Sequence, residues 1–376
     1  MIDYSRLGTT LRSARTVQVH RAVLTAAQQP ARPPLVVAYY AERNLYAWKT
    51  LLTESRRLSW IITTNYSFVD LRGNLRGSHD PTVVTMTHRL GSKVQFRVAN
   101  LAGGGFDRDI AHAILTQPAP HARALASVLR VLDVHNYDGV NLDFENVSPK
   151  DRNALTLFAT KLSTAVRSRG KTLSIAVPGT TSDQPDNNWS GAFDLVALGR
   201  VSDAIIVMAY DEHWSTSSPG PVAALPWVEA VVQHTARQVG REKLLLGVAF
   251  YGYDWPKRGY AEGVSMREAV SRATIARTPI LWDTRGHVPY YKTAHRTVYF
   301  EDAYSIEAKL TLATRQRLAG IAAWRLGHEL PEVWDLLATY QQDPQALTSR
   351  NLTRKASASR KPTAMLPELL RLPLVR

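Results

Sequence analysis

The sequence predicts an α/β fold, a (β/α)8 TIM barrel, and three observations support it. The chain has 376 residues, a usual length for one α/β barrel and a long one for most other single domains. From residue 35 onward, eight short runs rich in β-branched and aromatic residues alternate with segments of helical periodicity. The runs are almost continuously apolar, which is typical of parallel strands covered by helices. An open, doubly wound sheet is the alternative, but no G-x-G-x-x-G motif follows the first strand.

The elements can be placed in chain order. Helices between the strands have recognisable ends: Ser148 and Pro149 fit the start of the helix after strand four, and Gly170 fits the residue beyond its end. After strand six, an apolar helical stripe ends at Gly240. The expected strands are LVVAYY (35–40), LSWIITTNYSF (58–68), KVQFRVAN (93–100), YDGVNLDFE (137–145), TLSIAVPG (172–179), DAIIVMAYD (203–211), LLLGVAFYGYDW (244–255) and GIAAWRLG (320–327).

Domain boundaries follow from connection lengths and from charge. Residues 256–304 are too long for a β/α connection, so we expect a small strand-rich insertion between strand seven and the last helices. The barrel domain then spans residues 35–343. Of the formal charge of +14, +4 lies in residues 1–34 and +6 in residues 344–376. We expect a basic N-terminal extension and a basic, disordered tail.

Composition excludes several classes of protein and site. The chain has no cysteine, which excludes disulfides, thiolate catalysis and cysteine-bound metal. His213 and His328 lack partners at metal-ligand spacing, so we expect no metal and no cofactor. No stretch approaches the roughly 18 apolar residues of a membrane span, and no secretory signal is visible at the N-terminus. The barrel region has no basic patch interleaved with aromatic residues, so no nucleic-acid partner is expected, whereas the basic ends could bind an anionic wall polymer.

The stretch YDGVNLDFEN (137–146) places three carboxylates on an expected strand. Acidic residues are poor strand formers, so their presence there needs a reason. Because side chains alternate along a strand, Asn141, Asp143 and Glu145 point to one face and the apolar residues to the other. Two carboxylates so close cannot both ionise freely, and one that keeps its proton can act as a general acid. The alternative is a strand end whose acids cap the next helix or face solvent.

Polar and aromatic residues also follow other strands at their C-terminal ends, where barrels of this type place their functional sites. Strand three is followed by the glycine cluster NLAGGGF (100–106), which would let a ligand approach the backbone closely. Strand six ends in Tyr210 and Asp211, and strand eight contains Trp324. Aromatic faces stack on sugar rings and carboxylates transfer protons, so these residues indicate a carbohydrate cleft.

These motifs resemble glycoside hydrolase family 18, the chitinase-like barrels. Asp138-x-x-Asn141-x-Asp143-x-Glu145 is similar to the D-x-x-D-x-D-x-E signature of that family. The resemblance extends over roughly residues 35–340 and includes the glycine-rich turn, the M-x-Y-D of strand six and the tryptophan of strand eight. The segments NLAGGGFD, VNLDFEN and VYFEDAYSIEAKL look most like the bacterial spore-cortex and cell-wall N-acetylglucosaminidases. Residues 35–343 would then be the catalytic domain.

The resemblance implies a catalytic role for three residues. Glu145 would be the general acid that protonates the glycosidic oxygen and then the base that activates water. No enzyme nucleophile would be needed, because the 2-acetamido oxygen of the substrate attacks the anomeric carbon in this family. Asp143 would hold the acetamido N–H, and Tyr210 would bind the acetamido oxygen. Asn141 departs from the family's aspartate and cannot titrate, so the usual proton sharing between inner carboxylates is in doubt.

The resemblance also implies substrate contacts. Trp324 would form the floor beneath the cleaved sugar, and Asp211 would contact the same sugar. Asp138, at the expected buried start of its strand, would support the array. The expected substrate-binding residues are Asp211, Trp324, Asp138, Asn141, Tyr40, Gly104 and Tyr251.

The implied function is hydrolysis of a β-linked, N-acetylglucosamine-containing polysaccharide, peptidoglycan or chitin-like, with retention. The alternative is a catalytically silent relative that binds glycans. Silent members usually lose the terminal glutamate of the signature, and Glu145 is present here. We expect a monomer, and the family implies an extracytoplasmic or cell-envelope location.

Overall fold

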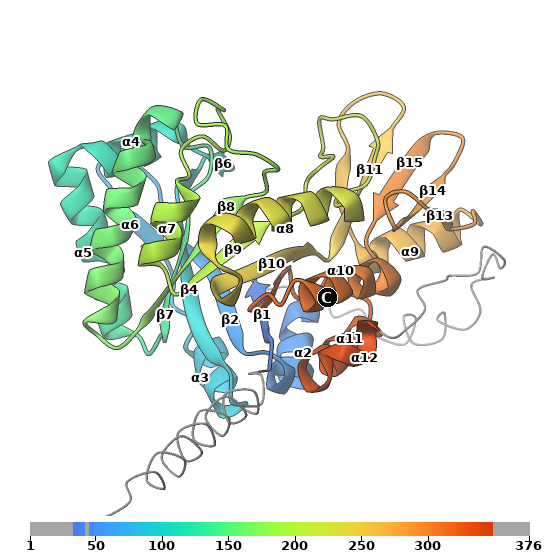
Figure 1. The fold of residues 1–376 in the computed structure, drawn as a ribbon, viewed down its shortest axis with the longest axis horizontal. Coiled ribbons are helices and arrows are strands. Elements are labelled where there is room, and N and C mark those ends of the chain that lie inside the picture. The colour runs from blue at the N-terminus through green and yellow to red at the C-terminus, as the bar shows by residue number, and fades with distance from the viewer. Residues whose placement is uncertain (1–32, 42–44, 349–376) are drawn as a thin grey trace, which may run out of the picture. The chain divides into compact units, whose positions relative to one another are not determined.

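The computed structural model describes residues 33–41 and 45–348 (Figure 1). The expected N-terminal extension therefore lies outside the described residues except for Pro33 and Pro34, and so does the expected tail from residue 349 onward. The first residues assigned to that tail form a short helix, α12 (Pro344–Thr348). Leu347 of this helix is fully buried, and its carbonyl accepts a hydrogen bond from the Thr311 hydroxyl at 3.4 Å. The ordered domain thus continues beyond the expected boundary at residue 343.

Eight parallel strands close into a barrel, as the sequence predicts (Figure 1). Each strand pairs with the next in the order given below, and the last pairs back onto the first. A short strand, β3 (Leu75–Gly77), extends the sheet by pairing antiparallel with the second barrel strand. The barrel strands are β1 (Leu35–Tyr40), β2 (Trp60–Phe68), β4 (Lys93–Ala99), β7 (Gly139–Asp143), β8 (Thr172–Pro178), β9 (Ala204–Met208), β10 (Leu244–Ala249) and β16 (Gly320–Trp324).

Alternation along each strand divides the side chains between two environments. Val37 and Tyr39 of β1 belong to the cluster inside the barrel, with Ile206 of β9 and other inward residues. Val36 and Tyr40 of the same strand face outward and pack in the larger core between the strands and the helices. This double burial explains why the strands are apolar almost without interruption.

Helices cover the outer face of the barrel (Figure 1). Their ends follow local rules: the Asp80 carboxylate accepts from two backbone N–H groups of α3, and Gly240 ends α8 with φ of 94°. Ser148 precedes a short 3₁₀ turn (Pro149–Asp151), so α6 begins slightly later than expected. The helices are α2 (Leu45–Glu54), α3 (Pro81–Arg89), α4 (Arg108–Thr116), α5 (Pro118–Val134), α6 (Arg152–Arg167), α7 (Leu195–Val201), α8 (Leu225–Val239), α10 (Ala303–Arg315), α11 (Val333–Gln342) and α12.

The insertion is a five-stranded antiparallel sheet with one helix, α9 (Met266–Ile275). It begins earlier than expected, because the seventh apolar run is two strands rather than one. The chain leaves the barrel after Ala249, and Gly252 in the next strand approaches β15 so closely that a Cβ would lie 2.2 Å from the Tyr299 carbonyl oxygen. The strands of the sheet are β11 (Tyr251–Pro256), β12 (Glu262–Ser265), β13 (Leu281–Asp283), β14 (Val288–Lys292) and β15 (Arg296–Phe300).

A buried ion pair joins the end of the insertion to the barrel helices. Both Lys309 of α10 and Glu301, which follows β15, are almost completely excluded from solvent. The ammonium group contacts both carboxylate oxygens, at 3.0 and 2.8 Å. Burial raises the pKa of Glu301, and the Lys309 charge opposes that effect. Within the described ranges, no helix is both long and apolar enough to cross a membrane.

We predict that Lys309→Met lowers the free energy of unfolding by roughly 3–5 kcal/mol, because Glu301 would stay buried without its partner. Urea denaturation followed by circular dichroism measures the change. Arg57→Met is the control, since Arg57 forms a solvent-accessible pair with Glu54 at 2.8 Å and should contribute little. Equal effects of the two substitutions would contradict the prediction.

Candidate active site

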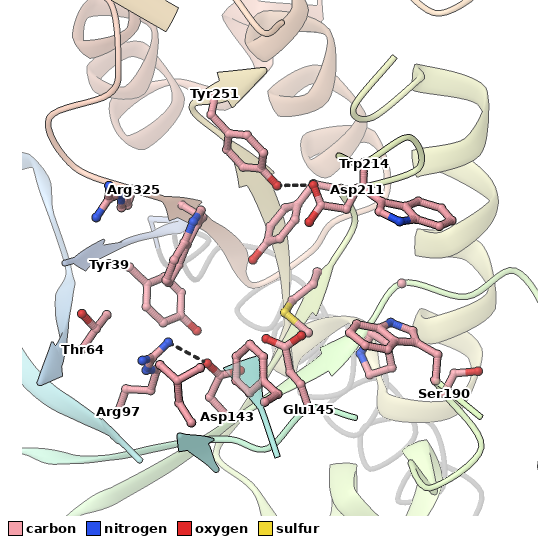
Figure 2. Close-up of a pocket in the computed structure, with 18 of the residues that line it drawn as sticks. Tyr39, Thr64, Arg97, Asp143, Glu145, Ser190, Asp211, Trp214, Tyr251 and Arg325 are labelled. Atoms are coloured by element: carbon pink, nitrogen blue, oxygen red, sulfur yellow. Dashed lines mark hydrogen bonds and ion pairs between the residues drawn. The ribbon is translucent and has the colours of Figure 1, made fainter. Parts of the chain in front are cut away.

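A cleft of about 1190 Å³ opens at the C-terminal ends of the barrel strands. Its lining comes from β1, β2, β4, β7, β8, β9 and β16, from the loops that follow them, and from β3 and β11. Figure 2 shows Asp143 and Glu145 between two walls, with Thr64 and Arg325 on one side and Ser190 and Trp214 on the other. This is the end of the barrel at which the sequence predicts the functional residues.

Asp143 is held by an arginine from the neighbouring strand. It is the last residue of β7, its side chain is 5% exposed, and its Oδ2 lies 3.2 Å from Nη1 of Arg97 on β4 (Figure 2). Burial raises the pKa of Asp143, and the Arg97 charge and hydrogen bond oppose that rise. The other carboxylate oxygen, Oδ1, is buried and has no hydrogen-bond partner among the described residues. An unpaired buried acceptor facing a cleft is available to a donor group of a ligand.

Glu145 has the environment of a general acid. Burial raises its pKa well above the usual range; the Asp143 charge raises it further, Arg97 lowers it, and Asp211 adds a smaller increase. Asn100, after β4, fixes the backbone here: its Oδ1 accepts from Glu145 N at 3.0 Å, and its Nδ2 donates to Glu145 O at 2.9 Å. Burial thus favours the protonated form of this carboxyl group, as a general acid requires, and Asn100 fixes the backbone that carries it.

Asp211 and Tyr210 form the facing side of the site. Asp211 has φ of 60°, and its Oδ1 accepts hydrogen bonds from the phenols of Tyr251 at 2.5 Å and Tyr253 at 3.1 Å. Burial raises the pKa of Asp211, and these two hydrogen bonds lower it. Burial raises the pKa of Tyr210 well above its usual range, so this phenol keeps its proton and can donate a hydrogen bond to an acceptor. The two tyrosines that bind Asp211 belong to β11 of the insertion.

The aromatic floor contains Trp324 and Tyr39, not Tyr40. The rings of Tyr39 and Trp324 lie 5.1 Å apart, and both residues line the cleft. Tyr40 is placed outside the cleft, in the core beneath the helices, because adjacent residues of a strand point to opposite faces. The Tyr39 hydroxyl donates to Oδ1 of Asn141 at 3.2 Å.

Asn141 and Asp138 also lie outside the cleft. Asn141 is fully buried inside the barrel, where its Nδ2 donates to Ser174 Oγ at 2.9 Å. Asp138 stands at the opposite end of β7, where its Oδ2 lies 2.8 Å from His88 Nε2 and accepts from Val94 N at 2.8 Å. Its side chain is 28% exposed rather than buried. A strand rises about 3.3 Å per residue, so the five-residue step from Asp138 to Asp143 covers the length of the barrel. The two carboxylates therefore lie at opposite ends of the barrel.

The glycine cluster after β4 builds a turn rather than a surface for a ligand. Gly103 and Gly104 have φ of 60° and 88° and connect β5 (Leu101–Ala102) to β6 (Gly105–Phe106). Two positive φ values are what a tight two-residue hairpin requires. Gly104 is exposed and does not line the cleft, whereas Leu101 and Phe106 on either side of the turn do.

The structure adds residues that the sequence motifs do not include: Arg97, Tyr39, Trp189 and Arg325 all line the cleft. Arg97 carried a usable signal, because a charged residue on an apolar strand is the same anomaly that marks Asp143 and Glu145. Trp189 lies in a polar loop and has no periodic pattern around it. The described residues contain no group of three acidic or histidine side chains that could hold a metal ion.

Comparison with known proteins gives the same family as the motifs. The model of the glycosyl hydrolases family 18 matches residues 35–329. The "Putative sporulation-specific glycosylase YdhD" of Bacillus subtilis is 32% identical over 238 residues, which are 61% of this chain and 56% of that protein. The cortical fragment-lytic enzyme of Bacillus anthracis is 26% identical over 315 residues, covering 80% of this chain and 73% of the relative.

A solved chitinase from Chromobacterium violaceum superimposes with a TM-score of 0.75 at 26% identity, over 82% of this chain and 98% of that one. The resemblance inferred from the motifs, the barrel fold and the glycosidase activity are thereby confirmed. The chain belongs to the glycosyl hydrolases family 18 and hydrolyses glycans.

Proposed function

We propose that this chain cleaves β-linked, N-acetylglucosamine-containing polysaccharide with retention, by substrate-assisted catalysis. The observation that carries the proposal is the unequal environment of two adjacent carboxylates. Arg97 stabilises the charge on Asp143, while burial and the Asp143 charge keep the proton on Glu145. Carboxyl groups whose environments separate their pKa values divide the roles of acid and charge stabiliser.

Glu145 is proposed as the general acid and then the general base. Its proton passes to the glycosidic oxygen as the bond to the leaving sugar breaks, and the resulting carboxylate then takes a proton from the attacking water. The Asn100 clamp on both backbone atoms of Glu145 supports this role, since proton transfer needs a fixed distance to the scissile oxygen.

The nucleophile is proposed to be the 2-acetamido oxygen of the substrate. A carboxylate nucleophile needs an oxygen that no other group binds, about 5 Å from the acid and on the other side of the sugar ring. Asp143 is the last residue of β7, two residues before Glu145, and is bound by Arg97. Asp211 is engaged by two phenols through one oxygen. Neither side chain is therefore arranged to attack the anomeric carbon.

The same geometry supports roles for the residues around the acetamido group. The unpartnered Oδ1 of Asp143 suits the acetamido N–H, and the charge would stabilise the cyclic cation that follows attack. Tyr210 would donate to the acetamido oxygen, and Trp324 with Tyr39 would pack beneath the ring. With Asn141 unable to titrate, Arg97 takes the place of a proton-sharing neighbour for Asp143.

We predict that Glu145→Gln lowers kcat/KM by roughly 10²- to 10⁴-fold, because the isosteric amide has no proton to transfer. The rate is measured on peptidoglycan strands and on chitin oligomers, with folding checked by circular dichroism. The control Glu332→Gln removes an exposed carboxylate just before α11 and should leave the rate unchanged. A Glu145→Gln enzyme with most of its turnover intact would show that another group is the acid.

The second prediction concerns pH. The alkaline limb of the kcat/KM profile should report a Glu145 pKa above the usual glutamate range, because burial and Asp143 favour the protonated form. Asp143→Asn removes a charge that raises this pKa. Glu145 then loses its proton at a lower pH. The alkaline limb of the variant's kcat/KM profile, normalised to its own maximum, therefore shifts to lower pH. Asp335→Asn, exposed on α11, is the control. An unmoved or more alkaline limb would refute the electrostatic coupling.

The third prediction tests the nucleophile. Oligomers whose cleaved sugar carries a free 2-amino group should not be hydrolysed, even where they bind, because they lack the attacking oxygen. A thiazoline analogue of the cyclised intermediate should inhibit competitively and more tightly than substrate binds. Proton NMR should show the β-anomer as first product. An α-anomer, or efficient cleavage of the deacetylated oligomer, would instead assign Asp211 as the nucleophile or base.

A further inference from the structure

Three arginines of the described residues line the cleft, and two of them have no acidic partner within those residues. Arg97 is paired with Asp143. Among the residues that the structure describes, no carboxylate lies within ion-pair distance of Arg76 or Arg325. The catalytic arrangement around Glu145 uses neither of them, so their presence in a glycan-binding cleft needs another explanation.

Arg325 is a cation held in a partly desolvated position. It follows Trp324 directly, is half-buried, and has its pKa lowered by burial alone. Its Nε lies 3.1 Å from Nε2 of His328. A guanidinium has only donors, so the imidazole must accept this hydrogen bond. Burial and the Arg325 charge lower the pKa of His328 to about 4, so the imidazole is neutral near pH 7 and suited to that role.

The contact with His328 orients the remaining donors of Arg325. No hydrogen bond joins its two terminal nitrogens to a described residue, and the side chain lies at the cleft (Figure 2). Removing a charge from water without a counter-charge costs free energy, which an anionic ligand group would offset. A fork of two parallel N–H donors matches the two oxygens of a carboxylate.

Arg76 belongs to the same wall of the cleft. It lies on β3 opposite Ser67 of β2, and both residues line the cleft. The strands β2, β1 and β16 are neighbours in the barrel, which puts Arg76 and Arg325 on one continuous wall. The opposite wall carries the half-exposed rings of Trp189 and Trp214, which suit the uncharged faces of sugars.

We propose that the β3–β2–β1–β16 wall binds carboxylates carried by the polysaccharide, with Arg325 as the main ligand and Arg76 as a second contact farther along the wall. The preferred substrate is then an acidic N-acetylglucosamine polymer rather than a neutral one such as chitin. This inference rests on the proposed function and narrows its substrate class. In a peptidoglycan strand, the carboxylate is either that of the lactyl ether on the alternate sugar or that of an attached peptide.

The test uses the full-length protein and matched substrates. Glycan strands stripped of peptide by an amidase carry a free lactyl carboxylate, and the same strands converted to the methylamide are neutral. Strands with intact peptides and chitin oligomers complete the set. The variants are Arg325→Gln and Arg76→Gln, and the control is Arg89→Gln, an exposed arginine at the end of α3. The readout is kcat/KM for each enzyme on each substrate, at low and at high ionic strength.

We expect the ratio of kcat/KM on stripped strands to that on methylamide strands to fall roughly tenfold to a hundredfold in Arg325→Gln. Arg76 is exposed, so Arg76→Gln should lower the ratio less, and Arg89→Gln should keep the wild-type ratio. Added salt should lower the ratio of the wild type and affect the Arg325 variant less, because screening weakens an ionic contact. If kcat/KM on peptide-bearing strands exceeds that on stripped strands, the carboxylate is that of the peptide.

Two results would overturn the inference. One is a wild-type enzyme that cleaves stripped, peptide-bearing and methylamide strands equally well. The other is an Arg325→Gln enzyme that loses the same factor on both, which would make Arg325 a general support of Trp324. Both leave the proposed function intact, since the strands are still cleaved. Failure of the proposed function is distinct, because the wild type would then cleave none of the N-acetylglucosamine polymers.

Discussion

The site depends on two largely desolvated carboxyl groups at the end of β7, the buried Asp143 and the partly exposed Glu145 two residues later. Desolvation disfavours the charged form of both, and a second charge beside the first adds to the penalty. Arg97 opposes the penalty mainly at Asp143, whose carboxylate it contacts at 3.2 Å, and it also lowers the pKa of Glu145. The pKa of Glu145 is raised further by the Asp143 charge, so the protonated form is favoured more strongly at Glu145 than at Asp143. The proposed division into charged neighbour and proton donor therefore rests on the environment and not on the residue types.

The barrel supplies the register on which this arrangement depends. In the β4–β7 pairing, Arg97 stands opposite Asn141 and Ala99 opposite Asp143, so the long arginine side chain reaches diagonally along the inner face. The inner polar groups continue through Asn141 to Ser174, whose hydroxyl donates to Oε1 of Gln95 at 2.6 Å. A barrel interior tolerates polar atoms when they bond to one another. The amide at Asn141 joins this network without adding a third buried charge.

The insertion completes the site rather than standing beside it. Its first strand brings Tyr251 and Tyr253 to Asp211, whose backbone has a left-handed conformation at the end of β9. A non-glycine residue with positive φ is uncommon and persists where surrounding contacts hold it. The buried pair of Lys309 and Glu301 then ties the last strand of the insertion to the barrel helices. Both ends of the insertion are thus attached to the barrel, the first of them at the cleft.

The sequence by itself determined the eight strands, the closed barrel and the central acids, because periodicity of two and buried apolar runs are local properties of the chain. It did not determine which of two neighbours in a strand faces the cleft: Tyr39 lies there and Tyr40 does not, since a shift of one residue reverses the face. Only the tertiary structure brought Arg97 to Asp143 and the insertion to Asp211. Those contacts join segments about 40 or more residues apart, and no local pattern specifies which distant side chains meet across a closed barrel.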